Sequence, residues 1–85
     1  MKNIIVYTQP DCPPCEITKR FLTEYGFSFE VKNIKTDQKA RMELIETYQS
    51  YSTPTIVIGE KVITGFDIEK LKSELNIQDG KEQTQ

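Results

Sequence analysis

The chain has 85 residues, 36% of them hydrophobic and 28% charged, with a formal net charge of −2. This length supports one small domain and leaves no room for a second core. The charge balance provides no basic surface, which argues against a nucleic-acid partner. The apolar runs are short beside the roughly 20 residues of a membrane span, so we also expect no membrane partner.

The amino terminus indicates a cytoplasmic protein. Met1-Lys2-Asn3 leads directly into a β-type run, without the extended apolar region or the small-residue cleavage site of a signal peptide. In the reducing cytoplasm a closely spaced pair of cysteines is more often catalytic or metal-binding than a lasting structural disulfide.

A strand and a helix are predicted first. Residues 3–8 favour a buried strand, because they contain three consecutive β-branched residues. A helix is predicted next, ending at about Tyr25, and Gly26 is a suitable residue to end it. The predicted inner face of this helix consists of Ile17, Phe21, Leu22 and Tyr25.

A second strand and a second helix follow. Residues 28–33 alternate, with Phe29 and Val31 on one side, as expected of a strand. After a polar turn, Asp37 is a suitable N-cap for a helix over residues 38–48. The predicted shared face of this helix consists of Arg41, Leu44, Ile45 and Tyr48.

The last predicted elements are a hairpin and a third helix. Residues 55–58 and 61–64 are β-type runs joined by a Gly-Glu pair, which indicates a hairpin with a type II′ turn. Asp67 is predicted to cap the third helix, whose inner face consists of Ile68, Leu71 and Leu75. Residues 78–85 are polar, so we expect a disordered tail after a domain over residues 1–77.

The resulting order, β-α-β-α-β-β-α, defines an α/β fold. The first two strands are joined by a helix and are predicted to be parallel, while the last two form an antiparallel hairpin. We therefore expect a mixed four-stranded sheet flanked by three helices, with its active site at the carboxyl end of the first strand.

Two cysteines carry the chemistry. Cys12 and Cys15 are the only cysteines in the chain and lie between the first strand and the first helix, where a CxxC is typical of a thiol–disulfide redox site. At the N-cap, Cys12 is close to the N–H of Cys15 and to the positive end of the helix dipole, so we predict that its pKa is lowered. Asp11 and Glu16 limit this effect.

Together with the CxxC, two further motifs in this order resemble the glutaredoxin family: Thr53-Pro54 before the hairpin, and Gly65-Phe66-Asp67 after it. The resemblance covers residues 3–76 and is greatest to short glutaredoxin-like redoxins, which include the hydrogen donors of ribonucleotide reductase. It implies a thioredoxin-like (glutaredoxin) fold and a thiol–disulfide oxidoreductase that reduces protein disulfides.

The resemblance also implies roles for individual residues. Cys12 would be the nucleophile and Cys15 the resolving thiol. Pro54 would be a cis-proline beside the disulfide, with the backbone of Thr53 pairing to a bound peptide or glutathione. The implied substrate-binding residues are Pro13, Pro14, Thr53, Pro54, Gly65, Phe66 and Asp67.

Two positions depart from the family pattern. Pro14 replaces the usual tyrosine and Phe66 a second glycine, and both departures argue against tight glutathione binding. We expect Phe66 to be exposed, as an apolar wall for substrate. The expected partners are a disulfide-containing protein and, as electron source, glutathione or thioredoxin reductase. We expect a monomer without a bound cofactor or metal.

Several alternatives stay open. Thr53-Pro54 also fits an ordinary turn before a strand, and Asp67 a simple N-cap. Two chains could share zinc or an iron–sulfur cluster through two CxxC pairs, although this chain has no His and no further Cys. Within the enzyme class, the alternative is a glutathione-dependent glutaredoxin that removes glutathione from proteins.

Overall fold

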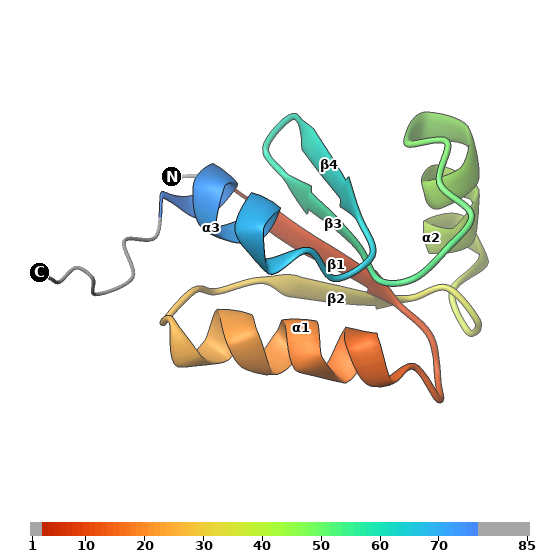
Figure 1. Cartoon of the computed structure of the whole chain (residues 1–85). Helices are drawn as coiled ribbons and strands as arrows, with labels where there is room; N and C mark the ends of the chain where they lie inside the picture. The colour runs from red at the N-terminus through yellow and green to blue at the C-terminus, as the bar shows by residue number, and fades with distance from the viewer. Residues whose placement is uncertain (1–2, 77–85) are drawn as a thin grey trace, which may run out of the picture.

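The computed structural model describes residues 3–76, which form a mixed sheet with helices on both faces (Figure 1). Across the sheet, the strands are ordered β2 (Glu30–Asn33), β1 (Ile4–Thr8), β3 (Thr55–Ile58) and β4 (Lys61–Thr64). β1 is parallel to β2 and antiparallel to β3, and β3 forms a hairpin with β4. The helices are α1 (Pro13–Glu24), α2 (Gln38–Met42), the π-helical η1 (Glu43–Thr47) and α3 (Ile68–Leu75). The predicted fold is confirmed.

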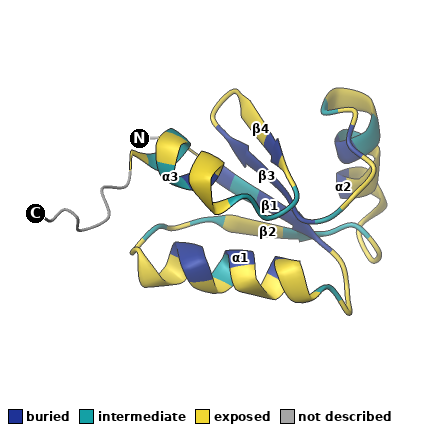
Figure 2. Ribbon diagram, in the orientation of Figure 1, coloured by how far each residue is buried: buried dark blue, intermediate teal, exposed yellow. Residues whose placement is uncertain are grey.

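The central strand β1 serves two cores because its side chains alternate between the faces of the sheet. Ile4 and Val6 belong to the core formed with α1 and α3. Tyr7 belongs to the core formed with α2 and η1, and the half-buried Ile5 packs against it. Figure 2 shows buried residues concentrated on β1 and β3, in the middle of the sheet.

The carboxyl end of α1 is a glycine turn, as predicted. Gly26 has a φ of +80°, which places it in the left-handed region that glycine adopts without strain. Its N–H donates to the carbonyl oxygen of Thr23 at 3.0 Å, and the N–H of Phe27 donates to that of Leu22 at 2.9 Å. This pair of bonds is the Schellman motif.

The predicted inner face of α1 is correct for Phe21 and Leu22 but wrong for Ile17 and Tyr25. The last two are 52% and 41% exposed. The reason is that the buried stripe of the helix consists of Cys15, Thr18, Phe21 and Leu22. Relative to the predicted orientation the helix is therefore rotated, so that a cysteine and a threonine are buried in place of Ile17 and Tyr25.

The helix predicted over residues 38–48 has two differently wound parts. α2 is capped as predicted, with the N–H of Ala40 donating to Asp37 Oδ1 at 3.1 Å. At the end of η1 the N–H of Tyr48 donates to the carbonyl oxygen of Glu43, five residues earlier, which is the π-helical bond. Of the residues predicted to share a face, Leu44 is buried in the core with Tyr7, and Tyr48 packs against the same core. Arg41 and Ile45 line a cavity that Leu44 also borders.

The second strand is shorter than predicted. β2 begins at Glu30 rather than at residue 28, and Val31 is 44% exposed. Phe29, directly before the strand, packs against the core that lies under α1 and α3. β2 is at the edge of the sheet, so part of its surface stays open to solvent.

The hairpin and α3 mostly follow the prediction. Gly59 has a φ of +59° and Glu60 is not in the left-handed region, the pattern of a type II′ turn. In α3, Leu71 is buried and Leu75 packs against the core, but Ile68 is 38% exposed because it lies in the first turn. Within residues 3–76, no helix has the length and apolar character to cross a bilayer. The predicted tail over residues 78–85 lies outside the described residues.

Candidate active site

Cys12 and Cys15 form a disulfide at the start of α1, after the loop that follows β1. Their Cα atoms are 5.2 Å apart, within the usual range for a disulfide. Cys12 is partly exposed, whereas Cys15 is fully buried. Cys12 is therefore the cysteine that another molecule can reach.

The first turn of α1 holds the sulfur of Cys12. Cys12 is the N-cap, and the N–H of Cys15 donates to both its carbonyl oxygen at 3.0 Å and its Sγ at 3.2 Å. Pro13 and Pro14 are the exposed first two helical residues, and neither has an N–H to donate. The predicted capping bond to the sulfur is confirmed.

The acidic neighbours of the cysteines are exposed, and one of them is paired. Glu16 forms an ion pair with Lys19 at 2.9 Å, so the lysine offsets part of the negative charge near the disulfide. Asp11 lies before Cys12 in the left-handed region, with a φ of +59°. The lowered pKa of Cys12 stays a prediction, because a disulfide-bonded sulfur does not titrate.

The Thr53–Pro54 peptide bond is cis, as the family resemblance implied. Pro54 is buried, and Thr53 Oγ1 lies 3.7 Å from Cys12 Sγ and donates to it. Gln9, which was not predicted as a site residue, donates from Nε2 to Thr53 Oγ1 at 3.0 Å. Nothing in the sequence indicates this contact, because the two residues are 44 positions apart.

The turn after β4 lies against the same loop. The N–H of Gly65 donates to the carbonyl oxygen of Pro54 at 2.7 Å. Phe66 is half-buried and packs edge-on against Phe21, with ring centroids 6.1 Å apart, so the expectation of an exposed wall is only partly correct. Asp67 is confirmed as the N-cap of α3, accepting from the N–H of Lys70. Its contact with a ligand stays a prediction.

A cavity of about 480 Å³ adjoins the disulfide through Gln9 and Thr53. We call it the Thr53 groove. Its lining includes two cationic residues, Lys35 and Arg41, and also Tyr51, which is 80% exposed. The groove therefore combines positive charge with an accessible aromatic ring next to the reactive pair.

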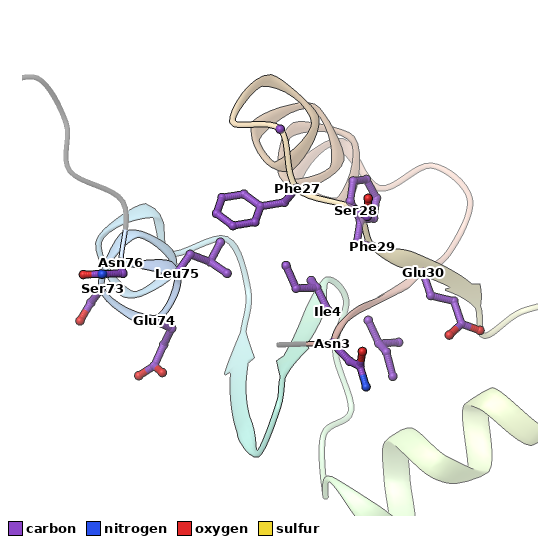
Figure 3. Close-up of a pocket in the computed structure, with 12 residues that line it drawn as sticks. Asn3, Ile4, Phe27, Ser28, Phe29, Glu30, Ser73, Glu74, Leu75 and Asn76 are labelled. Carbon is purple, nitrogen blue, oxygen red and sulfur yellow. The ribbon is translucent and has the colours of Figure 1, made fainter. Parts of the chain in front are cut away.

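A larger cavity, of about 1120 Å³, lies away from the cysteines (Figure 3). Its lining comes from the start of β1, the segment between α1 and β2, and the end of α3. Figure 3 shows Phe27 and Leu75 pointing toward each other across it. The disulfide lies at the opposite end of β1, so this cavity is separate from the redox site.

Behind the site, three polar side chains are joined on the α2 face of the sheet. Glu43 Oε1 accepts from the buried hydroxyl of Tyr7 and from Lys32 Nζ, both at 2.9 Å. The bonds from Lys32 and then from Tyr7 lower the pKa of Glu43, and the bond to Glu43 raises the pKa of Lys32. Burial, followed by the bond to Glu43, raises the pKa of Tyr7. The cluster links β1, β2 and η1 without reaching the sulfurs.

Among residues 3–76, no group of three or more His, Cys, Asp or Glu side chains is arranged to hold a metal ion.

Two sequence comparisons identify the family. The glutaredoxin family model matches residues 4–63. A glutaredoxin-like 8.6 kDa protein of the Clostridium pasteurianum rubredoxin operon is 34% identical over 71 residues, covering 80% of this chain and 95% of that protein. The glutaredoxin-like protein NrdH of Escherichia coli K12 is 32% identical over 64 residues, covering 75% of this chain and 78% of NrdH.

Solved structures agree with this result. The T8A mutant of the thioredoxin-like protein BC3987 is 53% identical, with a TM-score of 0.86 over 91% of this chain and 99% of that chain. The NrdH-redoxin of Escherichia coli is 28% identical, with a TM-score of 0.75 over 84% and 92% of the two chains. This chain therefore belongs to the glutaredoxin family, as a glutaredoxin-like redox protein whose CxxC pair is Cys12 and Cys15.

Proposed function

We propose that this protein reduces disulfide bonds in other proteins and so acts as an electron donor. The unequal exposure of its two cysteines carries the proposal. Cys12 is partly exposed at a helix N-terminus, whereas Cys15 is fully buried and within bonding distance of Cys12. A substrate disulfide can thus reach Cys12, while Cys15 reacts only within the molecule.

The reaction starts from the dithiol. The Cys12 thiolate attacks one substrate sulfur, so the substrate disulfide breaks, a Cys12–substrate disulfide forms, and one substrate thiolate leaves. The Cys15 thiolate then attacks Cys12 Sγ, which forms the Cys12–Cys15 disulfide and releases the second substrate thiolate. Two electrons pass to the substrate, and its two sulfurs take up the two protons that the cysteine thiols have lost.

We propose that thioredoxin reductase is the electron source. We also propose that the protein works as a monomer in the cytoplasm. A thioredoxin-like activity profile is described for the glutaredoxin-like NrdH-redoxin of Escherichia coli. In this chain, Phe66 fills part of the turn after β4 and packs on Phe21, where a second glycine would leave it open. This packing favours a thioredoxin-like profile over tight glutathione binding.

The Thr53 groove favours a second candidate, a glutaredoxin that uses glutathione as co-substrate. Glutathione has two carboxylates, and Lys35 and Arg41 line the groove beside the disulfide. If glutathione binds there, Arg41→Gln raises the KM for glutathione, because it removes a charge-assisted contact. Arg20→Gln, on the exposed side of α1, is the matched control and leaves the KM unchanged.

The electron source is tested by following NADPH consumption with the oxidised protein. One reaction contains glutathione and glutathione reductase, and the other contains thioredoxin reductase. A disulfide-containing protein such as insulin is the final acceptor, and Cys12→Ser is the inactive control. We expect turnover with thioredoxin reductase.

The other outcomes are equally informative. Turnover with glutathione alone selects the second candidate. Failure with both reductants, together with bound zinc, or with bound iron and visible absorbance, in the freshly purified protein, overturns both proposals in favour of a metal-binding dimer.

A further inference from the structure

We propose that the Thr53 hydroxyl donates a hydrogen bond to the thiolate of Cys12 in the reduced protein, and that Gln9 orients this hydroxyl. The inference rests on the proposed function in one respect, that Cys12 is the attacking sulfur. It concerns the side chain of Thr53, whereas the family resemblance implies a role only for its backbone.

Gln9, Thr53 and Cys12 form a directed chain of hydrogen bonds. Gln9 Nε2 donates to Thr53 Oγ1 at 3.0 Å, and Thr53 Oγ1 lies 3.7 Å from Cys12 Sγ. A hydroxyl has one hydrogen and two lone pairs. Because the Gln9 amide binds a lone pair, the hydrogen of Thr53 is left to point at the sulfur.

The start of α1 explains why a donor from outside the helix matters. Pro13 and Pro14 provide no N–H, and the N–H of Glu16 donates to the carbonyl oxygen of Cys12 at 3.2 Å. The N–H of Cys15 is shared between that oxygen and Sγ. Within residues 3–76, Thr53 is the second donor to this sulfur besides the shared N–H of Cys15.

Reduction of the disulfide strengthens the bond from Thr53. A disulfide sulfur is a weak acceptor, whereas a hydrogen bond to an ionised group is shorter and about twice as strong as a neutral one. The bond stabilises the thiolate relative to the thiol and so increases the fraction of Cys12 that is reactive at neutral pH. Thr53 touches the reacting atom and is a catalytic residue; Gln9 acts through it and is a positioning residue.

The test is the pH profile of Cys12 alkylation by iodoacetamide, measured in a Cys15→Ser background so that a single thiol reacts. Thr53→Val keeps the β-branched shape and removes the hydroxyl. We expect a higher apparent pKa and an alkylation rate at pH 7 that is about three- to tenfold lower. Thr53→Ser restores the hydroxyl and the profile, and Thr23→Val, at an exposed position of α1, leaves the profile unchanged.

A double-mutant cycle tests the role of Gln9. Gln9→Met lowers the rate at pH 7 when Thr53 is present and has no effect in the Thr53→Val background. Circular dichroism confirms folding, and Thr53→Ala takes the place of the valine variant if valine disrupts the loop. An unchanged pH profile in the hydroxyl-free variant overturns the proposal.

Alkylation needs neither a reductase nor a protein substrate. Its result therefore stays valid even if the proposed electron-donor function is wrong, so the two proposals fail separately.

Discussion

The N–H of Gly65 donates to the carbonyl oxygen of Pro54 at 2.7 Å, directly beyond the last pair of the β3–β4 ladder, Thr55 and Thr64. The hairpin thus continues by one hydrogen bond into the two loops that flank the redox site. As a result, the turn at Gly65 is held beside the Thr53–Pro54 step, and Thr53 contacts Cys12. The position of the loop at Thr53–Pro54 therefore depends on the position of the turn at Gly65.

Gly65 has a φ of +76°, and an added Cβ would meet no atom within 4 Å. Replacing Gly65 by alanine therefore costs backbone strain rather than a clash, and we expect the free energy of unfolding to fall by about 1–2 kcal/mol. Urea denaturation measures this change in the free energy of unfolding. Gly65→Asn loses less stability than the alanine variant, because asparagine tolerates the left-handed region. Equal losses for both variants would contradict this explanation.

Replacing Cys12 and replacing Cys15 are expected to affect disulfide reduction differently. Cys12→Ser removes the accessible sulfur and abolishes disulfide reduction. Cys15→Ser still attacks the substrate but cannot resolve the intermediate, so a mixed disulfide with the substrate accumulates. Mass spectrometry of the alkylated mixture detects this adduct. If it forms on Cys15 in the Cys12→Ser variant, the assignment of nucleophile and resolving thiol is reversed.

The cluster of Tyr7, Lys32 and Glu43 makes stability depend on pH. Glu43 has a lowered pKa in the folded state, so its contribution is present above the ordinary value of 4.5 and is lost as pH falls through the folded-state value. Replacing Glu43 by glutamine removes this contribution, so the variant loses less stability than the wild type when pH falls below about 4.5. The difference is small because the Glu43 side chain is 37% exposed.

Urea denaturation at pH 7 and at several acid values measures this difference. Glu46→Gln, at an exposed position of η1, is the matched control and keeps the pH dependence of the wild type. A Glu43→Gln variant that also behaves like the wild type would disprove the role of the cluster.

The rotated stripe of α1 predicts unequal costs for two apolar residues of the same helix. Leu22 is fully buried, so Leu22→Ala lowers the free energy of unfolding by about 2–5 kcal/mol. Ile17 is 52% exposed, so Ile17→Ala stays within about 0.5 kcal/mol of the wild type. Denaturation of the two variants side by side checks this. A large loss of stability in Ile17→Ala would show instead that Ile17 is buried, as its place in the hydrophobic pattern of the sequence predicts.

Much of the fold and the reactive pair follows from the sequence, because the signals are local. Runs of β-branched residues, the caps at Asp37 and Asp67, and Gly26 each act within a few residues of themselves. The disulfide is local in the same sense, since Cys12 and Cys15 are three positions apart at the start of one helix. The bond from the Cys15 N–H to the Cys12 sulfur depends on that helix alone.

Tertiary structure decided what lies around the cysteines. Antiparallel pairing of β1 with β3 sets Tyr7 opposite Thr55, which brings the residues beyond these ends, Gln9 and Thr53, together across 44 positions of sequence. Packing also determined that α1 buries Cys15 and Thr18 and exposes Ile17. Hydrophobicity alone cannot indicate such an arrangement, because it depends on which surfaces the sheet presents after it has formed. The sequence thus determined the reactive group, and the fold determined its donors and its accessible side.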